Sequence, residues 1–305
     1  MAIDANYVCS LVKPDDFDEF WSEVMEDSNK VGPDYVVEKD DLRSTDEVEV
    51  YQVFYSSIGN IRVSGWYAKP VDYINNLPAI VLLPGYQSDP PIPKDWAKNG
   101  YACFSVSPRG KVRSRSQFDP GYPGLLTHGI TSRDEYSYKG FYVDAWKAVD
   151  FLKTCEEVDG NRIGVTGSSQ GGGLTVILAA MRSEIKAAAA GAPYLCGFMD
   201  AIQLTNTYPY QEINDDLRTH PEARERVRDT LAYFDGISFA DKILCPIIVN
   251  IGLRDNVCPP ETGYALFERI ASNNKRLYEY NSHGHDAGGY LHNAIIQSFF
   301  DGQLK

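Results

Sequence analysis

The sequence lacks the features expected of a membrane, secreted or nucleic-acid-binding protein. No apolar run reaches the ~18 residues that a membrane span requires. Residues 1–6 have neither the basic start nor the apolar core of a signal peptide. Positive charge is also scarce: 29 Lys and Arg oppose 42 Asp and Glu, for a formal net charge of −13, which disfavours nucleic acid as a partner. We therefore expect a cytoplasmic protein with neither a nucleic-acid nor a membrane partner.

Close pairs of cysteines are absent as well. The six cysteines are scattered over 305 residues, and their spacing matches neither a disulfide framework nor a zinc site. We expect no metal and no cofactor. At 43% hydrophobic and 23% charged residues, the composition is that of an ordinary globular protein. The length suits one large α/β domain over residues 1–305.

Apolar strands and helical segments alternate along most of the chain. Continuous apolar strands are predicted around residues 77–86, 101–108, 186–191 and 245–252, with a further strand at 275–280. Helices are predicted at 141–152, 261–270 and 291–300. This alternation indicates a mostly parallel sheet covered on both faces.

Three segments depart from that alternation. The N-terminal part, residues 10–70, is expected to hold an amphipathic helix and an antiparallel hairpin of residues 48–55 and 61–68. The polar stretch 111–138 has no strong periodicity, and stretches of that length are more often functional or interface-forming than idle. Residues 192–236 are helical and charged, and we expect them to form a cap over the site.

The most informative stretch is a Gly-x-Ser-x-Gly turn centred on Ser169. A β-branched run precedes it, and an apolar, Ala-rich helical segment follows it. This strand–turn–helix context is that of a nucleophile elbow, in which the serine lies on a strained turn. Gly167 and Gly171 provide the clearance that the turn needs. We therefore predict that Ser169 is a catalytic nucleophile; an ordinary Gly-rich loop is the alternative.

A serine nucleophile needs a base and a carboxylate that orients this base. Asp255 follows a buried strand and stands at the edge where open α/β sheets bind their ligands. The base should follow it, and the candidates are His283, His285 and His292. His292 lies in the last predicted helix and is expected at the surface. His285, between Gly284 and an acid, is preferred over His283.

The chain resembles the acetyl xylan esterase/cephalosporin-C deacetylase family, carbohydrate esterase family 7, over nearly its whole length. The segments that carry the resemblance are residues 16–21, 85–86, 109–110, 122–124, 167–173, 233–236 and 255–260. The resemblance implies an α/β-hydrolase that removes acetyl groups from short xylo-oligosaccharides and other small acetylated compounds, and that assembles into hexameric rings. It also implies Ser169 as nucleophile, Asp255 as orienting acid and His285 as base, with the backbone N–H groups of Tyr86 and Gln170 as the oxyanion hole.

The sequence departs from the family pattern at two places. The family's Arg-Gly-Gln is Arg109-Gly110-Lys111 here, although Arg109 can still brace the elbow loop, and its His-Glu is His285-Asp286. A different small ester, amide or thioester, handled by a hydrolase or an acyltransferase, is therefore the alternative substrate class. We expect the substrate side of the site to include Tyr86, Val257 and Pro209.

Overall fold

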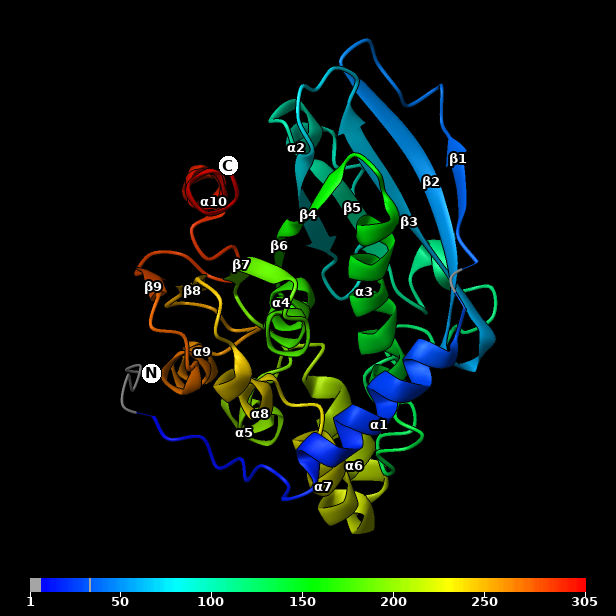
Figure 1. Cartoon of the computed structure of the whole chain (residues 1–305). Coiled ribbons are helices and arrows are strands. Elements are labelled where there is room, and N and C mark those ends of the chain that lie inside the picture. Colours follow the sequence, from blue (N-terminus) through cyan, green and yellow to red (C-terminus); the bar gives the residue numbers. More distant parts are fainter. Residues whose placement is uncertain (1–6, 33) are drawn as a thin grey trace.

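The computed structural model describes residues 7–32 and 34–305, and in this part of the chain nine strands form one sheet (Figure 1). Their order across the sheet is β1-β2-β3-β5-β4-β6-β7-β8-β9. The strands are β1 (Val36–Lys39), β2 (Val48–Ser57), β3 (Ile61–Pro70), β4 (Leu77–Leu83), β5 (Ala102–Ser107), β6 (Val158–Ser168), β7 (Ile185–Gly191), β8 (Ile247–Gly252) and β9 (Lys275–Tyr280).

The sheet has an antiparallel part and a parallel part. Strands β1, β2, β3 and β5 pair antiparallel in that order, and β2 and β3 form the long hairpin. From β5 through β4, β6, β7 and β8 to β9 every pairing is parallel. The carboxyl ends of these parallel strands therefore share one edge, where α/β sheets bind their ligands.

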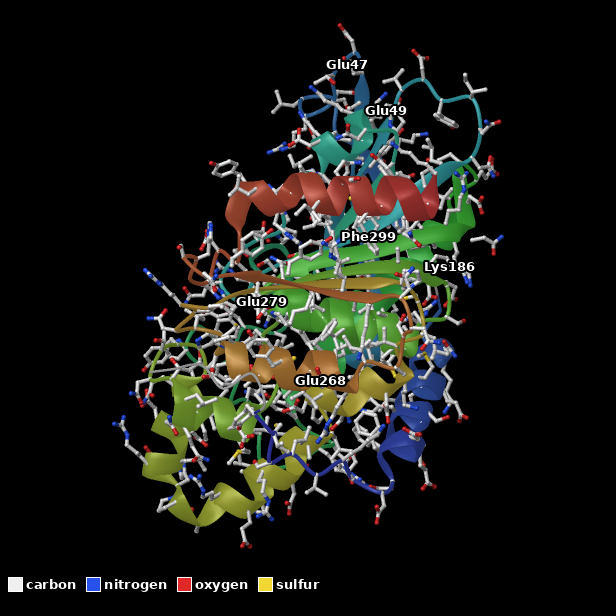
Figure 2. All side chains as sticks on the ribbon, turned by 90° about the vertical axis from the view of Figure 1, so that its left-hand side faces the viewer. Glu47, Glu49, Lys186, Glu268, Glu279 and Phe299 are labelled. Atoms are coloured by element: carbon white, nitrogen blue, oxygen red, sulfur yellow. The ribbon has the colours of Figure 1, made fainter. Side chains whose placement is uncertain are left out.

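Helices cover both faces of the sheet. They are α1 (Phe17–Lys30), α2 (Lys94–Lys98), α3 (Ser137–Thr154), α4 (Gln170–Met181), α5 (Phe198–Leu204), α6 (Gln211–Thr219), α7 (Arg224–Ala232), α8 (Gly236–Phe239), α9 (Pro260–Arg269) and α10 (Gly289–Leu304), with short 3₁₀ turns at Ile58–Asn60, Val112–Ser114, Pro221–Ala223 and Ala240–Lys242. Figure 2 shows the sheet nearly edge-on, with α10 (red) on one side and α9 (orange) on the other.

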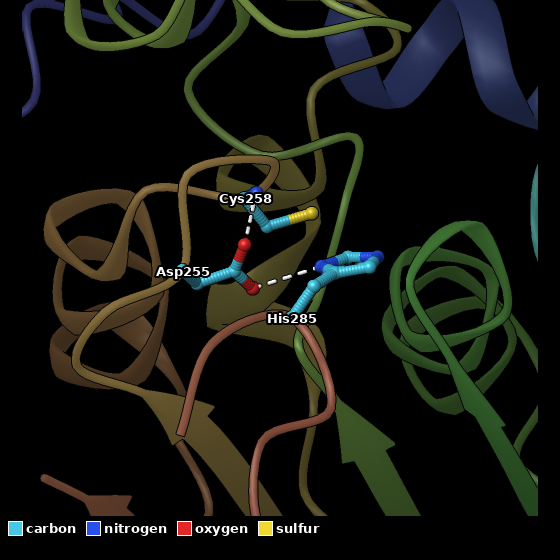
Figure 3. A group of neighbouring side chains, drawn as sticks. All are labelled: Asp255, Cys258 and His285. Carbon is cyan, nitrogen blue, oxygen red and sulfur yellow. Dashed lines mark hydrogen bonds and ion pairs between the residues drawn. The ribbon is translucent and has the colours of Figure 1, made fainter. Parts of the chain in front are cut away.

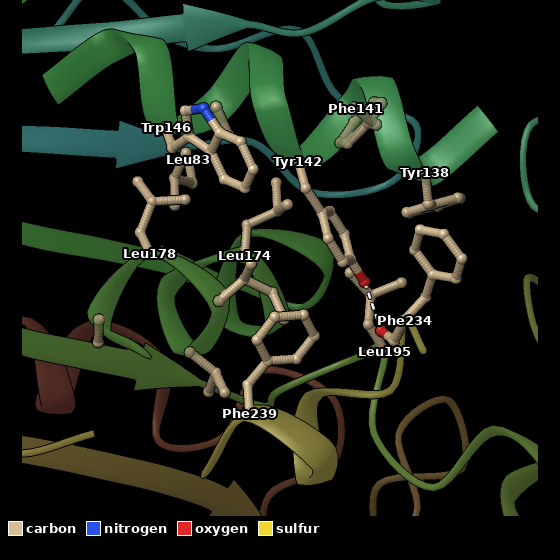
Figure 4. Close-up of a cluster of buried hydrophobic side chains, with 14 of the residues drawn as sticks. Leu83, Tyr138, Phe141, Tyr142, Trp146, Leu174, Leu178, Leu195, Phe234 and Phe239 are labelled. Atoms are coloured by element: carbon tan, nitrogen blue, oxygen red, sulfur yellow. Dashed lines mark hydrogen bonds between the residues drawn. The ribbon is translucent and has the colours of Figure 1, made fainter. Parts of the chain in front are cut away.

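The larger core lies on the face covered by α3 and α4. Aromatic residues of α3, including Tyr142 and Trp146, meet Leu174 and Leu178 of α4 there (Figure 4). The Tyr142 hydroxyl donates to the Phe234 carbonyl at 2.7 Å, so this buried polar atom has a partner. A smaller core joins α10 to the opposite face through side chains that include Phe300 and Leu304. Strands β4, β5, β7 and β8 are therefore buried on both faces, which explains their continuous apolar sequence.

The predicted fold class is confirmed: an α/β-hydrolase sheet, mostly parallel and covered on both faces, with an antiparallel N-terminal hairpin. Helices α5 to α8 occupy the region between β7 and β8 where the cap was expected. Strand β1 was not predicted, because its four residues are all exposed and show no buried face. Within the described ranges, no helix is both long enough and apolar enough to cross a membrane. The sequence-based expectation for residues 1–6 lies outside the described residues.

Candidate active site

Ser169 lies on a strained turn between β6 and α4. Its backbone has φ 59° and ψ −120°, a conformation that L-residues rarely adopt outside functional sites. The neighbouring backbone holds the turn: the Ser169 N–H donates to the Gly191 carbonyl at 2.9 Å, and the Ser169 carbonyl accepts from the Tyr194 N–H at 3.0 Å.

Two glycines make this turn possible. A Cβ atom at Gly167 would lie 2.7 Å from the Gly171 backbone, and one at Gly171 would lie 2.3 Å from the Leu83 carbonyl oxygen. Both distances are too short for real Cβ contacts, so β4, β6 and α4 can approach each other only with glycine at these positions. The clearance that was predicted for Gly167 and Gly171 is therefore the space that a Cβ atom would take from the neighbouring backbone.

Asp255 and His285 form a hydrogen-bonded pair at the same edge of the sheet. His285 Nδ1 lies 2.8 Å from Asp255 Oδ2 (Figure 3). The other carboxylate oxygen accepts from the Val257 and Cys258 N–H groups at 2.8 and 2.9 Å. The carboxylate is therefore anchored by backbone donors, and its side chain is only 2% exposed. Figure 3 shows the second ring nitrogen of His285 turned away from Asp255.

The other two histidine candidates lie elsewhere. His283 Nδ1 contacts Asp286 Oδ2 at 2.6 Å, on the outer side of the same loop. His292 was expected at the surface, and that expectation is wrong: the residue is 1% exposed and packs against β9, where Nδ1 lies 2.8 Å from the Tyr280 hydroxyl. Helix α10 turns this histidine toward the sheet. Of the three candidates, His285 is the one paired with Asp255.

Cys258 connects Ser169 to this pair. Its Sγ atom, His285 and Asp255 present ligand-type atoms that all lie within 4.8 Å of one another. Burial raises the pKa of the Cys258 thiol well above its usual range, and Ser169 is close enough to lower that pKa in part. A protonated thiol is a poor metal ligand, and both Asp255 oxygens already accept hydrogen bonds. These contacts suit a histidine–carboxylate pair beside a serine better than a metal site.

Two backbone N–H groups are available near Ser169. Gln170 is the first residue of α4, where helical N–H groups have no partner within the helix. Tyr86 lies in the loop after β4, and within residues 7–32 and 34–305 its N–H donates to no protein acceptor. The Gln170 side chain is itself fixed, because its Nε2 donates to the Tyr138 hydroxyl at 2.6 Å. Each of these two N–H groups is thus left without a backbone acceptor among the described residues.

The residues expected on the substrate side are held in different ways. The Tyr86 ring is buried, and its hydroxyl donates to Glu212 Oε1 at 2.8 Å. Glu212 belongs to α6, and its second oxygen accepts from the Gly124 N–H at 2.9 Å. Val257 is half-buried beside Asp255, and Pro209 is buried just before α6. Tyr86 is thereby tied to the helical insertion and to the 111–138 stretch.

In the described structure, none of the hydrogen bonds of Arg109 reaches the elbow. Its guanidinium holds both carboxylate oxygens of Asp144 in α3 at 2.8 Å, and it also reaches the Ile58 carbonyl. It thus fixes α3 against the strands, and α3 in turn reaches the elbow through Tyr138. Lys111, the departure from the family pattern, is buried and donates to the Gly85 carbonyl at 2.6 Å and to the Tyr86 carbonyl.

Sequence reasoning did not identify Glu212 or the placement of Cys258. In the sequence, Glu212 looks like any other acidic residue of a charged helix. Only its burial and its hydrogen bond with Tyr86 distinguish it from the other acidic residues of that helix. Cys258 carries a signal in the sequence, because it lies three residues after Asp255. That spacing brings its N–H onto the carboxylate and its thiol beside Ser169.

The comparisons with solved structures show close similarity to two esterases. The acetyl xylan esterase from Paenibacillus sp. R4 is 32% identical, with a TM-score of 0.92 over 98% of each chain. Acetyl xylan esterase 1 from Thermoanaerobacterium sp. JW/SL YS485 is 25% identical, with a TM-score of 0.89 over 97% of this chain and 96% of that one. An acylaminoacyl peptidase from Pyrococcus horikoshii, 18% identical over 87% of this chain and 43% of its own, shares the fold at a TM-score of 0.67.

Sequence comparisons agree. Acetyl esterase Axe7A of Xylanibacter ruminicola is 28% identical over 282 residues, which are 87% of this chain and 62% of that protein. This chain therefore spans less than two thirds of that relative. The family model described as acetyl xylan esterase (AXE1) matches residues 4–302. With this match over almost the full length, and with an elbow serine beside a histidine–carboxylate pair, the chain belongs to the acetyl xylan esterase family.

Proposed function

We propose that this protein is a serine esterase that removes acetyl groups from the hydroxyls of short acetylated saccharides or other small acetylated compounds. Family membership supports acetyl ester hydrolysis. The observation that carries the proposal is the 2.8 Å contact between His285 Nδ1 and Asp255 Oδ2 at the sheet edge where Ser169 occupies its strained turn. This arrangement has the parts of a Ser-His-Asp triad.

The first half of the reaction forms an acyl-enzyme. Ser169 Oγ attacks the ester carbonyl carbon, and His285 Nε2 takes the hydroxyl proton. Asp255 holds the ring so that Nδ1 carries its proton toward the carboxylate and Nε2 is free to accept. The carbonyl oxygen becomes an oxyanion that accepts from the Tyr86 and Gln170 N–H groups. As the tetrahedral intermediate collapses, the sugar oxygen leaves with the proton from His285.

The second half releases acetate. A water molecule gives a proton to His285 Nε2 and attacks the acyl carbon of the Ser169 ester. The same two N–H groups stabilise the second oxyanion. The Ser169 oxygen then leaves and regains its proton from His285, which restores the free enzyme.

Replacing Ser169 tests the proposal, because a triad acts as a unit. We expect Ser169→Ala to lower kcat on an aryl acetate by roughly 1,000-fold or more with the fold intact. Ser168→Ala is the matched control, since Ser168 is the exposed neighbour on the same turn. A fluorophosphonate probe should label the wild type and Ser168→Ala but not Ser169→Ala. Near-native turnover of Ser169→Ala would disprove the assignment.

The size of the acyl group separates the proposal from its alternative, a different small ester, amide or thioester. The buried Tyr86 ring and half-buried Val257 are expected to leave a shallow acyl site. We expect kcat/KM to fall by roughly 10-fold or more from acetyl to butyryl esters, because each methylene is worth ~1–3 kcal/mol in such a pocket. Val257→Ala should relieve this loss in part and retains the N–H that Asp255 accepts. Equal or rising kcat/KM from acetyl to hexanoyl esters would favour the alternative.

Three further assignments stay predictions. We propose first that the protein is cytoplasmic. We propose second that it forms a homo-oligomer, which the family resemblance suggests is a hexamer, and third that Pro209 borders the substrate. The molecular mass in solution by light scattering checks the second assignment against the chain mass of 34.1 kDa.

A further inference from the structure

Lys111 is a lysine almost completely removed from solvent. It is 2% exposed, and its ammonium group lies among aromatic rings, 5.7 Å from the Tyr86 ring, 5.3 Å from Tyr122 and 5.9 Å from Phe141. Its polar contacts go to the Gly85 carbonyl at 2.6 Å and to the Tyr86 carbonyl. A buried ammonium is costly unless it is well paired. Because both of its acceptors belong to one short loop, the burial of Lys111 calls for a functional explanation.

The two carbonyl groups belong to the loop that carries the Tyr86 N–H. The Gly85 carbonyl and the Tyr86 N–H are the two ends of one peptide group, which is planar and delocalised. A cation at the oxygen draws electron density toward that end and makes the N–H a stronger donor, because hydrogen bonds in a chain polarise one another. The charge also lies on the side of the peptide opposite to the developing oxyanion.

We propose that Lys111 is a positioning residue of the oxyanion hole: its ammonium holds the Gly85–Tyr86 peptide in place and polarises the Tyr86 N–H toward the tetrahedral intermediate. The inference rests on the proposed function, because it needs the Tyr86 N–H to meet the reacting oxygen. Lys111 itself touches the loop and not the substrate. A neutral donor in its place would hold the loop without the charge.

The surroundings make this charge sensitive to pH. Burial lowers the pKa of Lys111 to about 7, and the Asp89 carboxylate opposes that shift. Asp89 also pairs with Arg113 at 3.4 Å. Burial raises the pKa of both neighbouring phenols, Tyr86 and Tyr122, so they stay neutral near pH 7. Glu212 reaches the cluster through the Tyr86 hydroxyl, and burial raises its pKa. In this setting Lys111 loses its charge as the pH rises through about 7.

Two variants separate the charge from the hydrogen bond. Lys111→Gln keeps a donor but is neutral, whereas Lys111→Met has the length of the side chain and no donor. We expect Lys111→Gln to lower kcat on an aryl acetate by about 10-fold with KM within about 2-fold, less than the roughly 100- to 1,000-fold lost when an oxyanion donor is removed. Lys111→Met should lose more. Lys147→Gln is the matched control, because Lys147 is also a largely buried lysine and donates to the Val31 carbonyl in another region.

The pH profile of kcat provides the readout that a purely structural role would not move. Wild-type kcat should fall as pH rises through about 7 and the ammonium is lost. Lys111→Gln should lack that fall. Lys147→Gln should keep the wild-type profile.

Several results would overturn the inference. If Lys111→Gln has the wild-type kcat and the wild-type pH profile, the charge of Lys111 contributes nothing to catalysis. If neither Lys111 variant folds, the wild-type profile alone decides: a kcat that holds constant or rises from pH 7 to pH 9 rejects the inference. The proposed function is tested separately, since fluorophosphonate labelling of Ser169 does not depend on how kcat responds to Lys111.

Discussion

His283 and His285 are two residues apart, yet their rings contact different carboxylates. His285 meets the buried Asp255, and His283 meets the exposed Asp286. In a Ser-His-Asp triad the base must be held by the buried acid, because that contact fixes its tautomer and stabilises the imidazolium. The ring environments therefore favour His285 as the base.

This difference predicts unequal losses. We expect His285→Ala to lower kcat by roughly 1,000-fold or more and His283→Ala by less than about 10-fold. Steady-state kinetics of the two single variants on one aryl acetate is the measurement, and thermal melts of both confirm that each is folded. The opposite ranking would make His283 the base.

At the scale of elements, the site depends on how closely α4 approaches the sheet. Gly171, in the first turn of α4, lies against the end of β4, and a Cβ there would be 2.3 Å from the Leu83 carbonyl oxygen. Both partners are backbone, so neither can move without shifting a whole element. The elbow therefore exists only while α4 and β4 remain in this contact.

Gly171→Ala should therefore damage stability and activity together. We expect a loss of more than about 2 kcal/mol in the free energy of unfolding, as for other substitutions that strain a packed backbone. Gly160→Ala in β6 is the control: its Cβ would lie 3.8 Å from the nearest atom, and its stability should stay within about 1 kcal/mol of wild type. Chemical denaturation measures both. A Gly171→Ala protein as stable as wild type would refute the close-approach explanation.

At the scale of the whole molecule, a buried histidine is one of the contacts that join α10 to the sheet. His292 is 1% exposed, and its Nε2 has no hydrogen-bond partner among the described residues. Burial lowers the pKa of His292 from 6.5 to about 4. The unfolded chain therefore binds this proton at a higher pH than the folded protein does. Above pH 6.5 the ring is neutral in both states and adds no pH-dependent cost, and stability is lost as pH falls from 6.5 toward 4.

His292→Gln should remove this part of the acid sensitivity. Integrating the pKa difference gives at most about 3 kcal/mol between pH 6.5 and pH 4, at 1.36 kcal/mol per pKa unit. The measurement is the free energy of unfolding of variant and wild type across this pH range. The contribution of the carboxylates is common to both proteins, so it cancels when one free energy is subtracted from the other. The exposed His220 provides the control variant His220→Gln. Parallel curves for His292→Gln and wild type would contradict the prediction.

Much of the architecture could be predicted from the sequence because it depends on local patterns. Burial on both faces requires continuous apolar strands, so strands such as β7 and β8 were predicted to within a few residues. The Ser169 turn needs glycine at fixed offsets, which makes the elbow visible in five residues. Strand β1 escaped prediction because an exposed edge strand has no such pattern.

Contacts between distant segments were decided only by the tertiary structure. The residues around Ser169 determine that a nucleophile elbow can form, but the pairing of His285 rather than His283 with Asp255 depends on how the loop after β9 packs against the end of β8. Three other contacts join residues that are 12 to 126 positions apart in the chain. They are the hydrogen bonds of His292 with Tyr280, of Tyr86 with Glu212, and of Lys111 with the Gly85 carbonyl. No local period encodes such contacts, because they arise when the folded sheet brings separate loops to one edge.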